Sequence, residues 1–197
     1  MFQNSEIRLI GITGKKFNGK DTLGNYFVTN YNFKRLAFAD ALKEACRCIF
    51  GFTDEQLYGD KKEDIDIFWK TSPRIIFQYL GTDLFRNRLS VIMPHLGSDI
   101  WVEVLRKQIL DQWLTDEKKC IVVTDVRFPN EVKMIKNLGG IVLRVKRNNQ
   151  NNSTDLHTSE LNIDNLNVDA EILNNDTKEM LYENALSVLN KILNLKV

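Results

Sequence analysis

Residues 7–28 read IRLIGITGKKFNGKDTLGNYFV, and this stretch decides the fold. The mainly apolar run 7–12 is typical of a buried strand. The run stops in a loop that begins at Gly14 and ends at Gly19. Apolar side chains then return at helical spacing, so the pattern predicts a strand, a glycine-bounded loop and a helix in direct succession.

The loop, GKKFNGKDT over residues 14–22, has the spacing of a phosphate-binding P-loop. Small residues let the backbone curl until its N–H groups point inward, and the helix N-terminus adds a partial positive charge. A polyphosphate fits there, with Lys20 reaching its β- and γ-phosphates. The alternative is a glycine turn without a ligand, but the preceding strand and the following helix favour the phosphate site.

The residue after Lys20 departs from the usual motif. Ser or Thr normally holds Mg²⁺ there, whereas this chain has Asp21 followed by Thr22. A carboxylate is also a hard oxygen ligand for Mg²⁺, so Asp21 is expected to hold the ion directly or through a water. Thr22 is then expected to reach the α-phosphate.

Size and composition are those of about one globular domain: 197 residues, 43% hydrophobic and 27% charged. A formal net charge of +1 gives no general attraction to nucleic acid. The N-terminal residues form no secretory signal, and no run approaches the roughly 20 apolar residues that span a bilayer. Three cysteines without metal-ligand spacing favour free thiols in a reducing compartment, so a cytoplasmic location is expected.

Four further segments are predicted strands, at 33–39, 120–124, 141–145 and 170–173. Helical patterns lie between or after them, at 41–50, 73–80, 99–114, 129–138 and 178–195. Strands separated by helices indicate an α/β fold with a five-stranded parallel sheet covered on both faces. Ligand sites in such sheets lie beyond the carboxyl ends of the strands.

Capping residues set the expected helix boundaries. Asp40 stands at the position of an N-cap, and Ser72-Pro73 gives a cap followed by Pro in the first turn. Gly81 is expected to end that second helix. Residues 82–89 then form another short helix, capped by their Thr-Asp start.

Polar residues follow the predicted strands at their carboxyl ends. Asp40, Asp125 and Arg147 occupy such positions, which favours one shared site. Asp125 is expected to hold Mg²⁺ through water or to contact the acceptor; the alternative is a helix-capping role. Arg127 is well placed to bind a phosphate with its planar fork.

A second polar group lies in the helical region, at Arg74, Gln78, Thr82, Asp83 and Arg86. Its first two members are four residues apart and share a helical face, which suits a phosphate and a base edge. Ordinary surface polarity is the alternative.

A third, basic group precedes the Asn-rich segment 148–159, where a flexible loop is predicted: Arg144, Lys146 and Arg147. A loop with basic residues that closes over phosphates suits phosphoryl transfer, whose transition state is stabilised by positioning and positive charge. His157 stands inside that loop, and a lone exposed histidine is more often incidental.

The order of these pieces resembles the deoxynucleoside monophosphate kinases of large bacteriophages and other viruses. The pieces that carry the resemblance are GKKFNGKDT (14–22), FADALKE (38–44), SPRIIFQYLGTD (72–83), DIWV (99–102), DVRFPNE (125–131), RVKR (144–147) and HTSE (157–160). GKDT in place of GKST is itself a feature of that family. The resemblance implies a P-loop kinase fold with a helical acceptor-binding insert and a short lid. It also implies transfer of the γ-phosphoryl group of ATP to a deoxynucleoside 5′-monophosphate.

The resemblance implies roles for individual residues. Those expected to hold ATP and Mg²⁺ are Gly14, Lys15, Asn18, Gly19, Lys20, Asp21 and Thr22, with Asp21 and Asp125 as the metal ligands. Those expected to bind the acceptor are Lys16, Asp40, Lys43, Arg74, Gln78, Gly81, Thr82, Asp83, Trp101, Asp125, Arg127 and Glu131. The expected catalytic residues are Lys16, Lys20, Arg127 and Arg147, the last acting from the lid. Phe17 departs from the family at a position where some relatives carry a basic residue.

The implied organisation is one kinase domain over residues 1–197. Its core covers about 5–50 and 117–197, its helical acceptor-binding region about 51–116 and its lid about 147–160. The expected partner is a small deoxynucleotide, with no nucleic acid and no membrane, in a homodimer, and a viral protein would act in the host cytoplasm. Two alternatives stay open: another small-molecule P-loop kinase, such as a phosphomevalonate kinase, and a nucleotide-binding protein without phosphoryl transfer.

Overall fold

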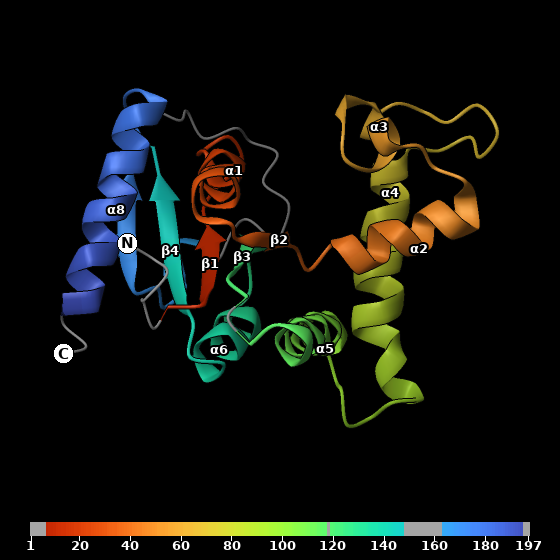
Figure 1. The fold of residues 1–197 in the computed structure, drawn as a ribbon. Coiled ribbons are helices and arrows are strands. Elements are labelled where there is room, and N and C mark those ends of the chain that lie inside the picture. The colour runs from red at the N-terminus through yellow and green to blue at the C-terminus, as the bar shows by residue number, and fades with distance from the viewer. Residues whose placement is uncertain (1–6, 118, 148–162, 195–197) are drawn as a thin grey trace. The chain divides into compact units, whose positions relative to one another are not determined.

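The computed structural model describes residues 7–117, 119–147 and 163–194. Its centre is a five-stranded sheet in the order β2-β3-β1-β4-β5, with all four neighbouring pairs parallel (Figure 1). The strands are β1 (Leu9–Thr13), β2 (Lys34–Leu36), β3 (Ile121–Val126), β4 (Ile141–Lys146) and β5 (Ala170–Leu173). The predicted five-stranded parallel sheet is therefore confirmed, and the last strand has the predicted bounds.

The α-helices are α1 (Lys20–Tyr31), α2 (Asp40–Phe50), α3 (Asp54–Leu57), α4 (Pro73–Gln78), α5 (Ile100–Thr115), α6 (Pro129–Asn137) and α8 (Lys178–Asn194). The other helical turns are η2 (Asp60–Lys62), η3 (Tyr79–Arg86), η4 (Leu89–Val91) and η5 (Ile163–Asn165), of which η3 is a π-helix. Among the described residues, no helix combines the length and the apolar character needed to cross a membrane.

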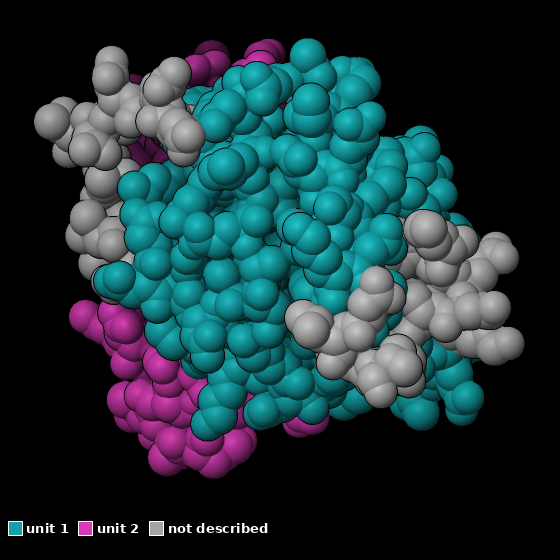
Figure 2. Space-filling view, turned by 90° about the vertical axis from the view of Figure 1, so that its left-hand side faces the viewer, with its two compact units in different colours: residues 1–37, 108–197 teal, residues 38–107 magenta. Residues whose placement is uncertain are grey.

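The chain forms two compact units, shown in different colours in Figure 2. Unit 1 takes in residues 1–37 and 108–197, and it holds the whole sheet with α1, α6 and α8. Unit 2 takes in residues 38–107 and is helical. The first part of α5 belongs to unit 2 and the remainder to unit 1. The P-loop region and the second polar group predicted from the sequence therefore belong to different units.

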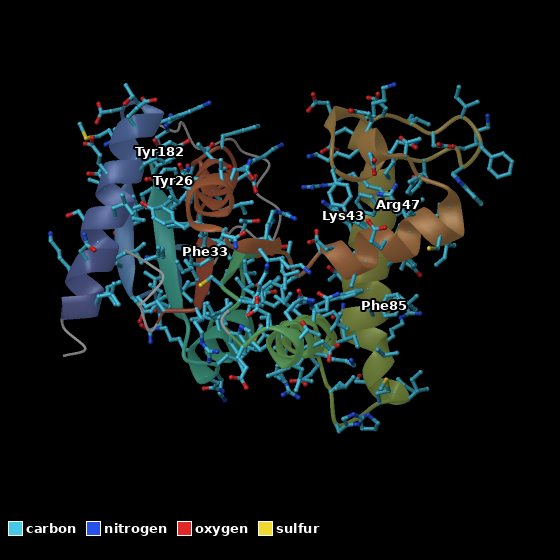
Figure 3. All side chains as sticks on the ribbon, in the orientation of Figure 1. Tyr26, Phe33, Lys43, Arg47, Phe85 and Tyr182 are labelled. Carbon is cyan, nitrogen blue, oxygen red and sulfur yellow. The ribbon has the colours of Figure 1, made fainter. Side chains whose placement is uncertain are left out.

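Helices α1 and α8 are joined by a pair of stacked tyrosines. The rings of Tyr26 and Tyr182 lie 3.9 Å apart and almost parallel (Figure 3). The Tyr26 hydroxyl also lies 3.4 Å from the Tyr31 hydroxyl. That hydrogen bond, helped by burial, raises the pKa of Tyr26 to about 12. The pair fixes α1, the helix that follows the P-loop, against the C-terminal helix.

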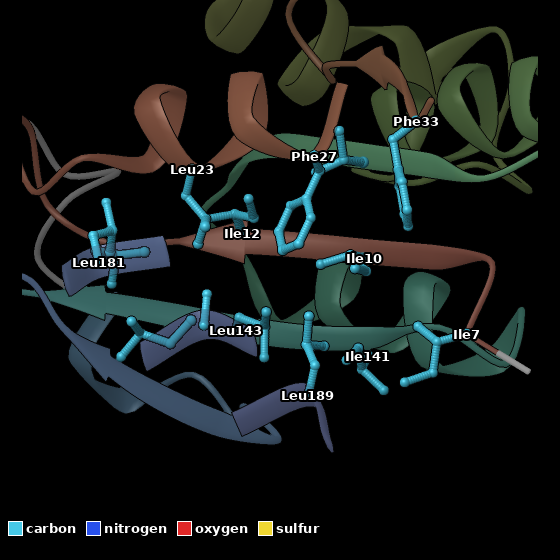
Figure 4. Close-up of a cluster of buried hydrophobic side chains, with 14 residues drawn as sticks. Ile7, Ile10, Ile12, Leu23, Phe27, Phe33, Ile141, Leu143, Leu181 and Leu189 are labelled. Carbon is cyan, nitrogen blue, oxygen red and sulfur yellow. The ribbon is translucent and has the colours of Figure 1, made fainter. Parts of the chain in front are cut away.

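Apolar side chains fill the space between the sheet and these two helices (Figure 4). Ile10 and Ile12 of β1 pack with Leu23 and Phe27 of α1, and all four are fully buried. Each such side chain contributes about 1.5–3 kcal/mol of burial free energy. This packing explains why the strand before the loop is apolar: it is the central strand of the sheet and is covered by helices.

The opposite face of the sheet is covered by α6, which contacts β1 and β4. Gly11 makes the close approach possible, because a Cβ there would lie 2.7 Å from the Ile135 side chain of α6. The sheet is thus covered on both faces, as predicted. The β1 position that faces α6 has to be a glycine, so the strand cannot be apolar throughout.

The predicted boundaries of β2, α2 and β3 were wrong. The strand predicted at 33–39 covers only Lys34–Leu36. Asp40 does not cap α2: it is the first residue of the helix, and the N-cap is Ala39, whose side chain accepts no hydrogen bond. Strand β3 does not stop before Asp125 but continues through it to Val126. The reason is an irregularity in the pairing of β3 with β1, where the register shifts between Gly11 and Thr13.

Arg144 proved to be structural. Its side chain is 6% exposed, donates to Glu171 Oε1 at 2.6 Å, and also donates to the carbonyl oxygens of Ile163 and Leu166. Lys146 Nζ lies 2.8 Å from the same Glu171 oxygen. Lys146 first, and Arg144 second, lower the pKa of Glu171. These contacts tie β4 to β5 and to the turn η5.

We expect Glu171→Gln to lower the free energy of unfolding by about 1–2 kcal/mol at pH 7, since the carboxylate is partly exposed. The pKa of Glu171 is depressed in the folded state. Its contribution is therefore complete above the unfolded pKa and is lost as the pH falls through the folded pKa. Urea unfolding at pH 7 and at pH 3 measures this. Equal stability of both proteins at pH 7 would contradict it.

Candidate active site

The loop between β1 and α1 has an unusual backbone. Gly14, Phe17 and Gly19 all have positive φ, at 147°, 65° and 98°. Such reversals turn successive N–H groups to one side and form a concave anion-binding nest. Gly19 is also the N-cap of α1 and provides no side chain for the first-turn amides. An anion is the natural partner for these amides and for the helix dipole.

Lys20 lies across this loop. Its Nζ donates to the carbonyl oxygen of Lys15 at 2.9 Å, so the side chain turns back over the loop instead of extending into solvent. Lys15 Nζ in turn lies 2.8 Å from Asp164 Oδ2, a residue of η5. Lys16 and Phe17 are exposed, with the Lys16 ammonium 5.0 Å from the Phe17 ring centre. The ammonium of Lys20 is thus already near the place predicted for phosphate.

Asn18 is buried and fastens the loop to the sheet. Its Nδ2 donates to the Val145 carbonyl of β4 at 3.0 Å, and its own backbone N–H donates to Lys15 O. Gly14 lies against the same strand, since a Cβ there would be 2.4 Å from Val145 O. The sequence analysis assigned Asn18 to ATP; the described contacts give its side chain a part in shaping the loop.

The segment after β3 is shaped by Glu131. This carboxylate is 2% exposed, and its Oε2 accepts hydrogen bonds from the backbone N–H groups of Arg127 (2.7 Å) and Phe128 (3.1 Å). It therefore fixes the backbone that carries the Arg127 side chain at the start of α6. The contact of Glu131 with the acceptor stays a prediction.

The donor set at this edge of the sheet fits a magnesium ion shared with phosphate. Asp21 is exposed in the first turn of α1, and Asp125 is half-buried near the end of β3. In the part of the chain that the structure describes, no three His, Cys, Asp or Glu side chains form a metal site alone. Mg²⁺ is commonly held by one or two carboxylates together with phosphate oxygens and waters, which matches this arrangement.

Two threonine hydroxyls of the central strands are buried near this end of the sheet. Thr13 Oγ1 and Thr124 Oγ1 are buried, and neither has a hydrogen-bond partner within the described residues. Both lie near the carboxyl ends of their strands, β1 and β3. Polar groups of this kind are suited to a ligand or an ordered water at the same edge.

Arg147 directly follows β4. Its Nε–H donates to the carbonyl oxygen of Asn174 at 2.9 Å, which fixes the base of the side chain at the end of β5. Arg147 is the one residue of the predicted lid, 147–160, that the structure describes. The other lid residues, with His157 and the HTSE piece, lie outside the described residues. Asn174 was missed by the sequence analysis. The available signal was its position directly after the last strand.

In unit 2, the predicted start of α4 is confirmed. Ser72 Oγ accepts from the Ile75 N–H at 3.4 Å, and Pro73 is the first helical residue. Arg74 and Gln78 are half-buried and four residues apart on this helix. Arg74 Nε lies 4.0 Å from Glu63, so its side chain is only loosely paired there.

The helix does not end at Gly81, contrary to the prediction. A π-helix, η3, continues directly from α4 to Arg86 and contains Thr82 and Asp83, so no separate capped helix begins there. Gly81 is buried because Leu42 packs against it, and a Cβ would lie 2.8 Å from the Leu42 side chain. Wide π-turns are rare and often occur at functional sites.

Trp101 stabilises this wide turn. Its ring is 9% exposed, its Nε1–H donates to the Gly81 carbonyl at 2.8 Å, and its ring centre lies 5.3 Å from that of Phe85. Phe85 is itself part of the π-helix. The indole thus contacts the helix that carries the predicted acceptor residues Thr82 and Asp83.

A polar cluster on α2 includes two other predicted acceptor residues, Asp40 and Lys43. The Lys43 ammonium lies 4.4 Å from the centre of the Tyr58 ring, and the Tyr58 hydroxyl donates to Glu44 Oε1 at 2.8 Å. Arg47 pairs with the same Glu44 at 2.9 Å (Figure 3 labels Lys43 and Arg47). Burial, and then the bond to Glu44, raise the pKa of Tyr58. The sequence analysis missed Tyr58.

The predicted site residues therefore fall into two groups. In unit 1, the P-loop, Asp125, Arg127 and Arg147 gather at the carboxyl ends of β1, β3 and β4. In unit 2, the other group is on α2, α4, η3 and the start of α5. The convergence of Arg74 with the first group stays a prediction.

A parallel sheet whose central strand leads through GKKFNGKDT into a helix defines the class of P-loop proteins. The fold is similar to that of dephospho-CoA kinase from Campylobacter jejuni (TM-score 0.51, 16% identity, covering 96% of this chain and 99% of that one). It is equally similar to TT1252 from Thermus thermophilus (TM-score 0.51, 17% identity, covering 95% and 98%).

Residues 53–185 match the family of deoxynucleotide monophosphate kinases. Over 186 residues the chain is also 38% identical to a protein of Acanthamoeba polyphaga mimivirus described as a candidate deoxynucleotide monophosphate kinase, covering 92% of this chain and 96% of the relative. The chain belongs to the deoxynucleotide monophosphate kinase family, as the resemblance predicted. The family match begins after the P-loop, so it does not depend on that widespread motif.

Proposed function

We propose that this protein transfers the γ-phosphoryl group of ATP to a deoxynucleoside 5′-monophosphate, giving a deoxynucleoside diphosphate and ADP. The observation that carries the proposal is the curled P-loop with Lys20 across it, in a chain whose residues 53–185 match this kinase family. Neither feature would be sufficient alone, because P-loops serve many reactions and a family match does not establish a working donor site.

The proposed chemistry is an in-line displacement. A phosphate oxygen of the acceptor bonds to the γ-phosphorus as the bond to the β–γ bridging oxygen breaks, and ADP leaves with that electron pair. Backbone N–H groups and Lys20 hold the β- and γ-phosphates, while Lys16, Arg127 and Arg147 stabilise the charge on the transferred group. Bound Mg²⁺, held by Asp21 and Asp125, would supply charge neutralisation on the phosphate oxygens.

The acceptor is proposed to bind through residues of unit 2 together with Arg127. The residues assigned this role are Asp40, Lys43, Arg74, Gln78, Gly81, Thr82, Asp83 and Trp101. The buried position of Trp101 and its bond to Gly81 support an action through the π-helix. The helical region 51–116 would then serve the acceptor, the lid at 147–160 would close over phosphates, and residues 5–50 and 117–197 would form the core.

We expect Trp101→Phe to raise the KM for the acceptor about tenfold, the equivalent of one lost hydrogen bond of about 1.4 kcal/mol, with the KM for ATP changed less than twofold. The phenylalanine keeps the contact with Phe85 but cannot donate to the Gly81 carbonyl. Trp113→Phe is the matched control, since Trp113 also donates to a backbone carbonyl, that of Lys119. Equal changes in both KM values would contradict a role in acceptor binding.

The function is tested by measuring ADP release with each deoxy- and ribonucleoside monophosphate, and with mevalonate 5-phosphate as the competing acceptor. The proposal expects turnover with at least one deoxynucleotide, and loss of that turnover when EDTA removes Mg²⁺. Turnover with mevalonate 5-phosphate alone would favour the other small-molecule kinase. ATP binding without turnover on any acceptor would favour a non-enzymatic nucleotide-binding protein.

A homodimer in the cytoplasm, or in the host cytoplasm for a virus-encoded protein, completes the proposal. Several large apolar side chains of unit 2 are exposed and are compatible with self-association: Ile65, Ile67, Phe68, Val91 and Ile92. Cys46, Cys48 and Cys120 form no disulfide within the described residues, which suits a reducing compartment. Light scattering on the purified protein measures the mass, and a monomer at micromolar concentration would exclude the dimer.

A further inference from the structure

Asn174 is a buried polar residue that has no role in the function proposed above. It directly follows β5 and is 6% exposed. Its backbone N–H donates to Lys146 O at 2.8 Å, and its backbone carbonyl accepts from Arg147 Nε at 2.9 Å. Its side-chain Nδ2 donates to the backbone carbonyl of Asn18 at 2.8 Å, across 156 residues of sequence. One residue therefore contacts both the P-loop and the base of Arg147.

The bond to Asn18 O sets the orientation of one peptide unit of the P-loop. In a trans peptide the C=O of one residue and the N–H of the next point in opposite directions. Since the Asn18 carbonyl points to Asn174, the Gly19 N–H points away from Asn174. Gly19 is the N-cap of α1, so this N–H belongs to the group of amides that a phosphate would bind.

Packing adds to this hydrogen bond. A Cβ on Gly19 would lie only 2.5 Å from Asn174 Nδ2, so the amide occupies the space beside the glycine. Gly19 has a φ of 98°, a left-handed conformation that glycine adopts readily and other residues adopt rarely. On the other side of the loop, the Asn18 side chain donates to Val145 O at 3.0 Å. The peptide between Asn18 and Gly19 is therefore held from two strands, β4 and the end of β5.

We propose that Asn174 is a positioning residue for the donor nucleotide: its side-chain amide holds the peptide between Asn18 and Gly19 so that the Gly19 N–H is available to a bound phosphate. The backbone carbonyl of Asn174 places Arg147 beside the same loop. Only the expected effect of Asn174 on turnover rests on the proposed function. Its effect on ATP affinity depends on the P-loop alone.

The test compares Asn174→Ala and Asn174→Leu with wild type. The leucine has the same branched four-atom side-chain skeleton as asparagine, in a larger volume, and it removes the donor without opening a cavity, so it also covers the case in which the alanine variant does not fold. Asn184→Ala is the matched control, because Asn184 Nδ2 donates to a carbonyl at the end of β5, that of Leu173, and not to the loop. The hydrogen bonds that the Asn174 backbone makes with Lys146 O and Arg147 Nε remain in both variants.

ATP affinity is measured by calorimetry with Mg²⁺ and a non-hydrolysable ATP analogue, and the thermal midpoint and steady-state kinetics are measured on the same samples. We expect the analogue to bind about tenfold more weakly to both Asn174 variants, with the KM for the acceptor changed less than twofold. The control is expected to match wild type.

Unchanged affinity for the analogue in either folded variant would overturn the proposal, even if the thermal midpoint fell, because the amide would then serve stability alone. Wild-type protein that binds the analogue but transfers no phosphoryl group would overturn the proposed function and leave the affinity comparison valid. A similar loss of affinity in Asn184→Ala would also overturn the assignment to Asn174.

Discussion

Lys20→Ala is expected to lower kcat for phosphoryl transfer by about 10²–10³-fold, the loss typical of removing one charged or hydrogen-bonding group from a developing anion. The ammonium lies over the P-loop, where its Nζ donates to Lys15 O at 2.9 Å. A bound polyphosphate would take that interaction in place of the carbonyl, because a charged acceptor is stronger than a neutral one. The stabilisation is greatest in the transition state, where negative charge moves towards the β–γ bridging oxygen.

Single-turnover measurements at saturating ATP and acceptor isolate this effect from product release. Lys178→Ala is the matched control, because it removes an exposed lysine from the start of α8 that is not part of the loop. Circular dichroism should show the same helix content in both variants, since the Lys20 side chain is not part of the apolar core. Near wild-type turnover in Lys20→Ala would contradict the assignment of Lys20 to the phosphates of ATP in the P-loop.

The features predicted correctly from the sequence depend on local patterns. β1 and α1 were predictable because an apolar run, two glycines and a helical spacing are consecutive in the chain, and each limits the backbone by itself. The capping box at the start of α3 is a signal of the same local kind, with the Thr53 side chain accepting from the Gln56 N–H and the Gln56 side chain accepting from the Thr53 N–H. Such signals need no knowledge of distant residues.

The features that were wrong depend on contacts between distant parts of the chain. Gly81 has the sequence features of a helix end, but it lies inside a π-helix. Leu42 packs against it, and the Trp101 indole N–H donates a hydrogen bond to its carbonyl oxygen. β3 continues past Thr124 because its pairing with β1 shifts register. Nothing in the sequence around Gly81 or Asp125 indicates these distant contacts. The sequence therefore predicts a helix end at the glycine and a strand end at the aspartate.

The same difference applies to the site. Residues of the P-loop could be predicted because their motif is contiguous, whereas Asn174 is 156 residues from the carbonyl that it contacts. Arg144 and Arg147 look alike in RVKR, yet Arg144 is buried against Glu171 and Arg147 is at the end of β4. Side chains alternate along a strand, so Arg144 and Arg147 lie on opposite faces. Which of the two faces holds an acidic partner is decided by Glu171 on the neighbouring strand, β5.

Arg127→Ala is expected to lower kcat/KM for the acceptor by about 10²–10³-fold, because the proposed two-point contact of its guanidinium with the transferred phosphoryl group would be lost. The structure supports a defined position for this residue. Glu131 accepts from the Arg127 N–H at 2.7 Å and from the Phe128 N–H at 3.1 Å, which fixes the backbone at the point where the side chain leaves it. A backbone that is already ordered loses little further entropy when the side chain binds a phosphate.

Arg127→Lys separates charge from geometry. A lysine keeps the positive charge but cannot bind two phosphate oxygens with a planar fork, so we expect it to recover only part of the lost rate, about tenfold. Lys133→Ala is the matched control, because it removes an exposed cation from the same helix, α6. Steady-state kinetics at varied acceptor concentration measure all three variants. Full activity in Arg127→Ala would show that Glu131 orders this segment for stability alone, and the charge at the transferred phosphoryl group would then have to come from Lys16 and Arg147.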